Sequence, residues 1–362
     1  MPGGNHLEAL LDGPTWVMAR AEPGLGRLTE AVSLTTILTA AGARAPTRFY
    51  TTPAAAPLAR RLLRRPVHGF ELGRGEDPQQ TLIDSPGVQR LLVALRRSRP
   101  AAVVVDGYPL LLPLLRALSP ARLVAMANLH DLRNPAHSRG ARLLQEALHG
   151  GSDLILVSEL RRGWVRDRIG EVPVLRIPSL VRLEVPSGRL LQGRGPAPPV
   201  VAVLGGGSRG DSRLQASDRA ILAALERAVG RGVLPMCLVF AGGGPGPAEP
   251  EFPHLAFASD PAACLPTLAQ AELVIARAGR STLAEVLAHG RHAVAVIPES
   301  DTLRGAEQAA NAAAAARLSP AIIPLPVTEL GRLSDACRRA ALASPRSWRP
   351  GNAVVLDALA AV

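Results

Sequence analysis

Short apolar runs alternate with amphipathic segments along most of the chain, and this alternation constrains the fold more than any other feature. The run 200–204, for example, has the length and composition of a buried strand. In the segment 28–41, apolar side chains recur at helical spacing. Because strands that alternate with helices form parallel sheets, we predict an α/β protein with two doubly wound Rossmann-like domains that face a cleft.

The expected elements form two sets. In the first set we predict strands at 15–19, 48–52, 101–106, 123–128, 153–158 and 174–177, and helices at 28–41 and 54–65. In the second set we predict strands at 200–204, 236–241, 254–258, 272–276, 293–297 and 322–324, and helices at 217–229, 262–269, 282–289 and 306–318, followed by two further helices.

The alternating pattern is interrupted once, by a segment rich in glycine and proline at 186–199. Such composition is typical of a linker between domains. We therefore predict an N-terminal domain at 1–185 and a second domain at 200–345. The remaining residues, 346–362, form a C-terminal helix that could pack back on the first domain.

The charge balance is basic, with a formal net charge of +11, and every basic residue is an arginine. A nucleic-acid partner would be one explanation. We instead expect none, because the arginines are scattered in short groups and aromatic residues make up only 3% of the chain. Arginine enrichment together with alanine, glycine and proline is typical of GC-rich coding. Attraction to an anionic substrate or to a membrane surface remains open.

The three cysteines are odd in number, far apart and set in apolar surroundings. This pattern favours reduced thiols over a disulfide framework or a metal site. The first residues lack the basic start and apolar run of a signal peptide, and the most apolar stretch, 101–118, is interrupted by charged residues and prolines. We therefore predict a cytoplasmic protein.

A glycine-rich loop, GGGSRG at 205–210, follows the strand at 200–204. Glycines there let backbone N–H groups approach an anion at the start of a helix. A dinucleotide site would also need an acid at the end of the next strand, which instead runs into Gly242. A P-loop would need a lysine, and the chain has none. The loop is thus a phosphate cradle for an unspecified nucleotide, or a tight turn without a ligand.

Two further segments carry polar side chains at helix starts. In the strand–turn–helix 273–290, Thr282 and Glu285 have capping-box spacing, so Glu285 taken alone is more readily a helix cap than a ligand contact. His289 and Gly290 are typical of the end of that helix. The carboxamides at the start of 306–318 suit hydroxyl and phosphate recognition, although a solvated first turn has the same composition. No Asp-x-Asp pair follows a plausible strand, so we expect no metal-ligating residues and no cofactor.

Together these segments resemble the C-terminal, nucleotide-sugar-binding domain of GT-B glycosyltransferases of family 28. The resemblance covers about 200–323 and rests on GGSRG, ARAGRSTLAEVLAHG and EQAANA in that order. It implies a nucleotide-sugar donor, foremost a UDP-sugar, and it makes Glu285 a ribose ligand, a role compatible with a cap.

The resemblance also implies the other donor contacts. It places the glycine loop at the diphosphate, the strand end at 257–258 near the base, and the amides of the last segment at sugar hydroxyls and phosphate. The residues so assigned are Gly206, Gly207, Ser208, Gly210, Phe257, Ala258, Arg277, Gly279, Thr282, Glu285, Glu307, Gln308 and Asn311.

The N-terminal half resembles the family more loosely. Arg27 stands where such enzymes have a histidine that serves in acceptor activation. Arginine cannot act as a base at physiological pH, but it could bind a diphosphate or carboxylate. The candidate bases are Asp106, at the end of a buried strand, and His130. We favour Asp106, although a role as helix cap for the residues after it is about equally supported.

These observations predict a metal-independent glycosyltransferase that uses a small-molecule or lipid-linked acceptor. Two alternatives remain open, a nucleotide-sugar hydrolase and a non-catalytic nucleotide-sugar-binding protein. The sequence does not identify the sugar, the acceptor or the stereochemical outcome.

Overall fold

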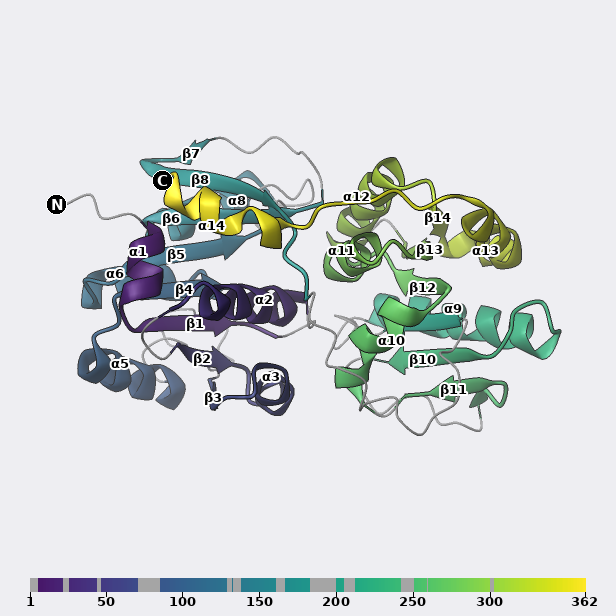
Figure 1. Ribbon diagram of the computed structural model, residues 1–362, viewed down its shortest axis with the longest axis horizontal. Coiled ribbons are helices and arrows are strands. Elements are labelled where there is room, and N and C mark those ends of the chain that lie inside the picture. The colour runs from purple at the N-terminus through teal and green to yellow at the C-terminus, as the bar shows by residue number, and fades with distance from the viewer. Residues whose placement is uncertain are drawn as a thin grey trace. The chain divides into compact units, whose positions relative to one another are not determined.

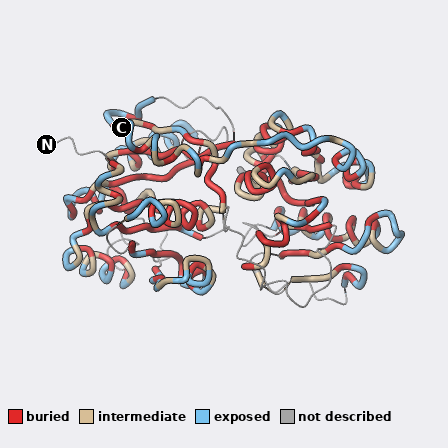
Figure 2. The backbone as a smooth tube through the Cα atoms, viewed as in Figure 1, coloured by how far each residue is buried: buried red, intermediate tan, exposed pale blue. Residues whose placement is uncertain are grey.

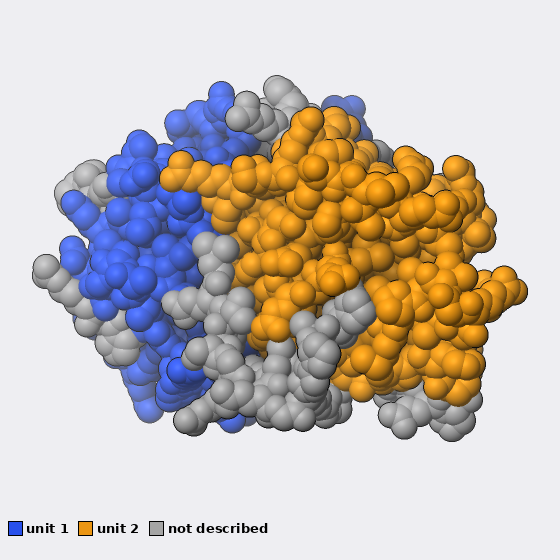
Figure 3. Space-filling view, turned by 45° about the vertical axis from the view of Figure 1, so that its right-hand side comes forward, with its two compact units in different colours: residues 1–21, 27–180, 351–362 blue, residues 22–26, 181–350 orange. Residues whose placement is uncertain are grey.

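The computed structural model of the chain describes residues 6–21, 26–43, 47–70, 85–128, 132, 138–160, 167–182, 200–204, 212–241, 251–258, 260–299 and 303–362. The chain forms two compact units (Figure 3). Unit 1 contains Met1–Ala21, Arg27–Leu180 and Gly351–Val362, and unit 2 contains Glu22–Gly26 and Val181–Pro350. The predicted linker 186–199 lies outside the described residues.

Unit 1 is built on an eight-stranded sheet with the order β3-β2-β1-β4-β5-β6-β8-β7 (Figure 1). All neighbouring strands are parallel except β7, which is antiparallel to β8. The strands are β1 (Thr15–Ala19), β2 (Arg48–Thr51), β3 (Val67–Gly69), β4 (Ala102–Asp106), β5 (Arg122–Ala127), β6 (Leu154–Glu159), β7 (Arg168–Ile169) and β8 (Val172–Pro178).

Helices flank this sheet, and a serine N-cap explains where two of them begin. In α5, Ser85 is the N-cap, its hydroxyl oxygen accepts a hydrogen bond from the backbone N–H of Val88, and a proline follows it. Ser138 caps α8 in the same way. The helices of unit 1 are α1 (His6–Asp12), α2 (Gly26–Ala40), α3 (Ala56–Leu63), α5 (Pro86–Ser98), α6 (Leu111–Leu118), α8 (Arg139–His149) and α14 (Val355–Ala360).

The C-terminal segment is part of unit 1. Helix α14 packs against α1 and β8. Just before this helix, the N–H of Gly351 donates a hydrogen bond to the carbonyl of Ser179 at 3.1 Å. A Cβ atom at Gly351 would lie 2.0 Å from the carbonyl oxygen of Pro178, so only glycine allows this close approach of the two backbones.

Unit 2 is built on a six-stranded parallel sheet with the order β11-β10-β9-β12-β13-β14. Its strands are β9 (Val200–Leu204), β10 (Cys237–Ala241), β11 (Leu255–Phe257), β12 (Leu273–Arg277), β13 (His292–Ile297) and β14 (Ile322–Pro326). Its helices are α9 (Ser212–Gly230), α10 (Cys264–Gln270), α11 (Arg280–Ala288), α12 (Leu303–Leu318) and α13 (Leu333–Leu342).

The central strands of both sheets are almost wholly buried (Figure 2). This explains why they are continuous apolar runs: helices cover a parallel sheet on both faces. The predicted class, α/β with two doubly wound parallel-sheet domains, is confirmed. All three cysteines are free, as expected. Within the described ranges, no helix combines the length and apolar character needed to cross a membrane.

The two sheets share one connectivity. In each, the chain forms a central strand, adds two strands on one side, and then crosses to the other side of the central strand. The strand order therefore reverses between β1 and β4 in unit 1, and between β9 and β12 in unit 2. Ligands of such sheets bind at the carboxyl ends of the strands beside this switch point.

Candidate functional site

In unit 1, an ion pair lies at the switch point. Asp106 is the last residue of β4, and its Oδ1 lies 2.6 Å from Nη1 of Arg27 in the first turn of α2. The Asp106 side chain is 3% exposed and that of Arg27 is 23% exposed. The structure thus brings together two residues that the sequence analysis proposed separately for the catalytic step.

The geometry of this pair depends on Gly107. Its φ angle is +76°, a conformation that side chains other than glycine rarely adopt. A Cβ atom there would lie 2.8 Å from Cδ of Arg27 and 2.9 Å from Cβ of Arg20. Arg27 therefore reaches Asp106 across a position that must remain free of a side chain.

The interpretation of Asp106 as a helix cap is wrong. The next helix, α6, begins at Leu111, its N-cap is Leu110, and no side chain caps it. Asp106 instead presents a buried carboxylate at the carboxyl end of a central strand, paired with a guanidinium that cannot take up a proton. The other candidate base, His130, lies outside the described residues.

Sequence reasoning missed further acidic residues at this edge of the sheet. Glu30, one turn beyond Arg27 on α2, is 2% exposed and accepts a hydrogen bond from the Ser158 hydroxyl at 3.1 Å. Ser158 in turn accepts one from the backbone N–H of Leu180. Glu159, which ends β6, is also buried. For Glu159 the available signal was that of Asp106, an acid at the end of a buried apolar run, whereas Glu30 lies inside α2 and has no such signal.

In unit 2, Glu285 is a buried carboxyl group on α11, 7% exposed. Burial raises its pKa to about 7, and the positive charge of Arg182 opposes this shift. The capping-box interpretation is wrong, because α11 begins at Arg280 with Gly279 as its N-cap. Thr282 therefore lies inside the first turn, and Glu285 lies beyond it.

The environment of Glu285 suits hydroxyl recognition. A carboxyl group with a pKa near neutrality either accepts two hydrogen bonds or donates one and accepts others. The nearby Cys264 thiol stays neutral, because burial and the charge of Glu285 raise its pKa to about 12. Glu285 is thus a polar group shielded from water, and a ligand that forms hydrogen bonds with it there gains more binding free energy than it would at the surface.

The amides of α12 lie deeper than a solvated first turn would place them. The helix begins at Leu303, three residues before the predicted start, and Gln308 and Asn311 are 6% and 0% exposed. Nδ2 of Asn311 donates a hydrogen bond to the carbonyl of Ala278 at 3.4 Å and so links α12 to the turn after β12. Oε1 of Gln308 and Oδ1 of Asn311 are buried acceptors without a partner among the described residues. Glu307 is partly exposed.

The remaining predicted donor residues fall into three groups. Arg277, at the end of β12, is 4% exposed, and its Nε lies 2.9 Å from Oδ1 of Asp218 on α9. Phe257 packs against the core of unit 2, and the N–H of Ala258 donates to the carbonyl of Val239. The loop residues Gly206, Gly207, Ser208 and Gly210 lie outside the described residues.

No group of three or more His, Cys, Asp or Glu side chains in the described part of the chain has the arrangement that could hold a metal ion.

Residues 262–342, which carry Glu285, Gln308 and Asn311, match the glycosyltransferase family 28 C-terminal domain. No curated protein matches the chain. The resemblance to family 28 is thereby confirmed over these residues.

Several solved structures share the fold across both units. MurG of Acinetobacter baumannii has 18% identity and a TM-score of 0.52, covering 96% of this chain and 100% of its own. UGT89C1 of Arabidopsis thaliana, solved with UDP-L-rhamnose, has 15% identity and a TM-score of 0.58, covering 96% and 93%. The spinosyn rhamnosyltransferase SpnG, solved with thymidine diphosphate, has 16% identity and a TM-score of 0.53, covering 96% and 95%.

At these identities the structural likeness establishes the fold, which is that of the GT-B glycosyltransferases. Within this class, the second unit carries a C-terminal domain of the family 28 type over 262–342. The family match and the fold together support a glycosyltransferase enzyme.

Proposed function

We propose that the chain transfers a sugar from a nucleoside diphosphate sugar, foremost a UDP-sugar, to a hydroxyl group of its acceptor. The observation that carries this proposal is the buried carboxyl group of Glu285 within the segment that matches family 28. Burying a carboxyl group is costly, so its presence on α11 is best explained by a ligand that hydrogen-bonds to it. The two ribose hydroxyls of a nucleotide supply such hydrogen bonds.

The buried acceptors of Gln308 and Asn311 support a donor with further hydroxyl groups, because each lacks a partner in the described structure. One structural neighbour was solved with a uridine nucleotide and another with a thymidine nucleotide. We place UDP first because the family 28 resemblance implies it.

In the proposed reaction, Asp106 is the general base. Its carboxylate takes the proton of the acceptor hydroxyl, the oxygen attacks the anomeric carbon, and the bond from that carbon to the diphosphate oxygen breaks. The nucleoside diphosphate leaves with the bonding electron pair. Arg27, paired with Asp106 at 2.6 Å, orients the carboxylate and offers a guanidinium to anionic groups of the acceptor. Backbone N–H groups stabilise the leaving diphosphate without a metal.

The acceptor is proposed to be a small or lipid-linked molecule with a free hydroxyl group, and the site of action to be the cytoplasm.

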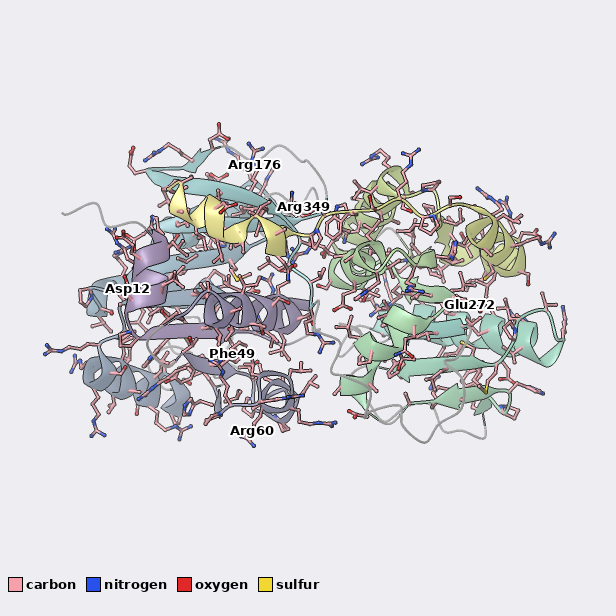
Figure 4. All side chains as sticks on the ribbon, in the orientation of Figure 1. Asp12, Phe49, Arg60, Arg176, Glu272 and Arg349 are labelled. Atoms are coloured by element: carbon pink, nitrogen blue, oxygen red, sulfur yellow. The ribbon has the colours of Figure 1, made fainter. Side chains whose placement is uncertain are left out.

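Calorimetric titration with UDP, TDP and GDP tests the donor site. We expect UDP to bind the wild-type chain and the Glu285→Ala variant to bind it about tenfold to a hundredfold more weakly, since hydrogen bonds to a charged group are lost. Glu272→Ala is the matched control, because Glu272 is an exposed glutamate of the same unit (Figure 4). Equal UDP affinity in the Glu285→Ala, Glu272→Ala and wild-type chains would overturn the assignment of Glu285.

A further inference from the structure

Helix α8 of unit 1 turns most of its apolar residues outward. Leu143 and Leu144 are 56% and 57% exposed. Gly140 and Ala147 are exposed as well. Because residues three, four or seven positions apart lie on one side of a helix, these four residues form one continuous apolar surface, which we call the α8 face.

The side of α8 that meets the rest of unit 1 is partly polar. Its buried residue is His149, which is 3% exposed and whose Nδ1 lies 2.8 Å from the carbonyl oxygen of Gln145. Leu148 is the one leucine of the helix that turns toward unit 1, and it is half-buried. A surface helix normally packs its apolar side on the core. In α8 the larger part of that side faces away from the core, as is typical of a surface that a partner covers.

A line of charged side chains borders the α8 face. Arg139 and Arg142 are exposed, and Glu146 is partly exposed. Their spacing of three and four positions places them along one edge of the helix. The two arginines stand toward the amino end of α8 and the glutamate toward its carboxyl end, so the edge changes sign along its length.

This order of charges is complementary to itself. When two identical helices pack antiparallel about a two-fold axis, the same edge of each faces the other with its order reversed. We place the axis at the height of the peptide bond between Leu143 and Leu144. Glu146 of each copy then comes within about 3 Å, measured along the helix, of Arg139 and Arg142 of the other copy.

Small residues let the two helices approach closely in this arrangement. Gly140 of one copy lies opposite Ala147 of the other, on either side of the central leucines. Unit 1 itself does not require the glycine, because beyond the backbone of the helix a Cβ atom there would meet only Oγ of Ser138, at 3.9 Å. A glycine within a helix lowers stability relative to alanine, so a close neighbour outside the chain explains its presence.

A second copy of the chain fits the α8 face better than a lipid surface does. Helices that lie on membranes combine a face rich in basic residues with large apolar side chains. The α8 face offers two leucines beside a glycine and an alanine. Its edge also carries Glu146, which the negative charge of an anionic membrane would repel.

We propose that two copies of the chain pair antiparallel through the α8 face, about a two-fold axis. The helix has 11 residues and is about 16 Å long, so the contact belongs to the small interfaces of weak, reversible complexes. A Kd on the order of 10–100 µM is expected. This inference does not depend on the proposed function, because α8 carries none of the residues assigned to donor recognition or to the base.

Sedimentation velocity of the full chain, over concentrations on both sides of that Kd, tests the pairing. The variant Glu146→Arg and the double variant Arg139→Glu with Arg142→Glu should each raise Kd at least about tenfold, because like charges then meet across the axis. An equimolar mixture of these two variants should form the dimer again, because every charged contact then joins an arginine to a glutamate. Leu342→Ser is the control, since Leu342 is 82% exposed in unit 2, and it should keep the wild-type Kd.

The double variant Leu143→Ser with Leu144→Ser tests the apolar part of the contact and should be monomeric, with its fold checked by circular dichroism. A wild-type chain that stays monomeric would overturn the inference, and so would a dimer that all of these α8 variants leave unchanged. A mixture of the two charge variants that forms no dimer would contradict the antiparallel pairing. A monomeric wild-type chain that binds phosphatidylglycerol vesicles through Leu143 and Leu144 would assign the α8 face to a lipid surface instead.

Discussion

The two units place an ion pair at the same point of the same sheet topology, but with opposite polarity. In unit 1 the strand end carries the acid, Asp106, and the helix after the central strand carries the arginine, Arg27. In unit 2 the strand end carries the arginine, Arg277, and the corresponding helix carries the acid, Asp218. The shared fold therefore specifies where a charge pair can form, and the sequence of each unit decides which sign stands at the strand end.

The two units also differ in the polar groups that are buried around their candidate sites. Around the carboxyl edge of the unit 1 sheet, Glu30 and Glu159 add buried carboxyl groups to Asp106. In unit 2 the buried polar groups of the family 28 segment, residues 262–342, include the amides of Gln308 and Asn311 and the carboxyl group of Glu285. An acidic edge suits proton removal, whereas amides and a nearly neutral carboxyl suit recognition of hydroxyls. We infer that the chemistry lies on unit 1 and donor recognition on unit 2.

The largest effect is expected for Asp106→Asn. Loss of the general base should lower turnover with a UDP-sugar donor by about 10²-fold to 10⁴-fold, because an amide cannot accept the proton. Glu30→Gln is the control, since it removes a neighbouring buried carboxylate that is bound to Ser158. Steady-state kinetics of both variants decide whether Asp106 or Glu30 is the general base. Full activity in Asp106→Asn, with activity lost in Glu30→Gln, would move the base from Asp106 to Glu30.

The next effect concerns the pH dependence of stability. Because burial raises the pKa of Glu285 to about 7, its charged form is disfavoured in the folded state. Below about pH 4.5 the group is protonated in both states, and above about pH 7 it is ionised in both. Stability is therefore lost as the pH rises through this window, by about 3 kcal/mol.

Denaturant unfolding of the wild-type chain and of Glu285→Gln at pH 5 and pH 8 measures this loss. The wild-type chain should lose stability relative to Glu285→Gln between the two values. Parallel pH dependence in the two proteins would show that Glu285 is not destabilised by burial.

A smaller effect is expected for Gly107→Ala. The substitution forces a side chain into a φ of +76° and into contact with Arg27, which should cost about 1–3 kcal/mol of folding free energy. Gly170, which also has a positive φ but open space around it, is the control, so Gly170→Ala should lose less. Thermal unfolding compares the two. Equal losses would mean that the contact with Arg27 contributes nothing beyond the backbone strain.

The smallest expected effect is that of a chelator. If backbone N–H groups stabilise the leaving diphosphate, activity should be unchanged by EDTA. Activity that disappears with EDTA and returns with Mg²⁺ or Mn²⁺ would contradict the metal-independent mechanism.

Sequence reasoning predicted the strands of the two sheets more completely than the helices that cover them. The strand at 200–204 was predicted with the observed bounds because a central parallel strand is a continuous apolar run. The short strands β3 and β7 and the helices α1, α5, α6 and α8 were not predicted, although α5 and α6 bury apolar side chains. In α8 His149 is the buried residue, so its apolar side chains do not mark a face toward the core.

In the candidate site, too, local sequence patterns did not predict contacts between residues far apart in the chain. Arg27 and Asp106 are 79 positions apart, and their pairing follows from strand order and register, which no local pattern contains. Thr282 and Glu285 had the spacing of a capping box, but Gly279 begins α11 earlier and leaves Glu285 beyond the first turn. Local spacing identified Glu285 as a polar group of interest, whereas burial, a property of the whole fold, gives it its chemistry.

The division of labour between the units is tested most directly by one titration, that of UDP into Asp106→Asn and into Glu285→Ala under identical conditions. We predict that Asp106→Asn binds UDP with wild-type affinity, because its carboxylate acts on the acceptor. Glu285→Ala should bind UDP about tenfold to a hundredfold more weakly, because it loses the ribose contact. UDP binding that is weakened by Asp106→Asn and unaffected by Glu285→Ala would contradict the assignment of donor recognition to unit 2 and chemistry to unit 1.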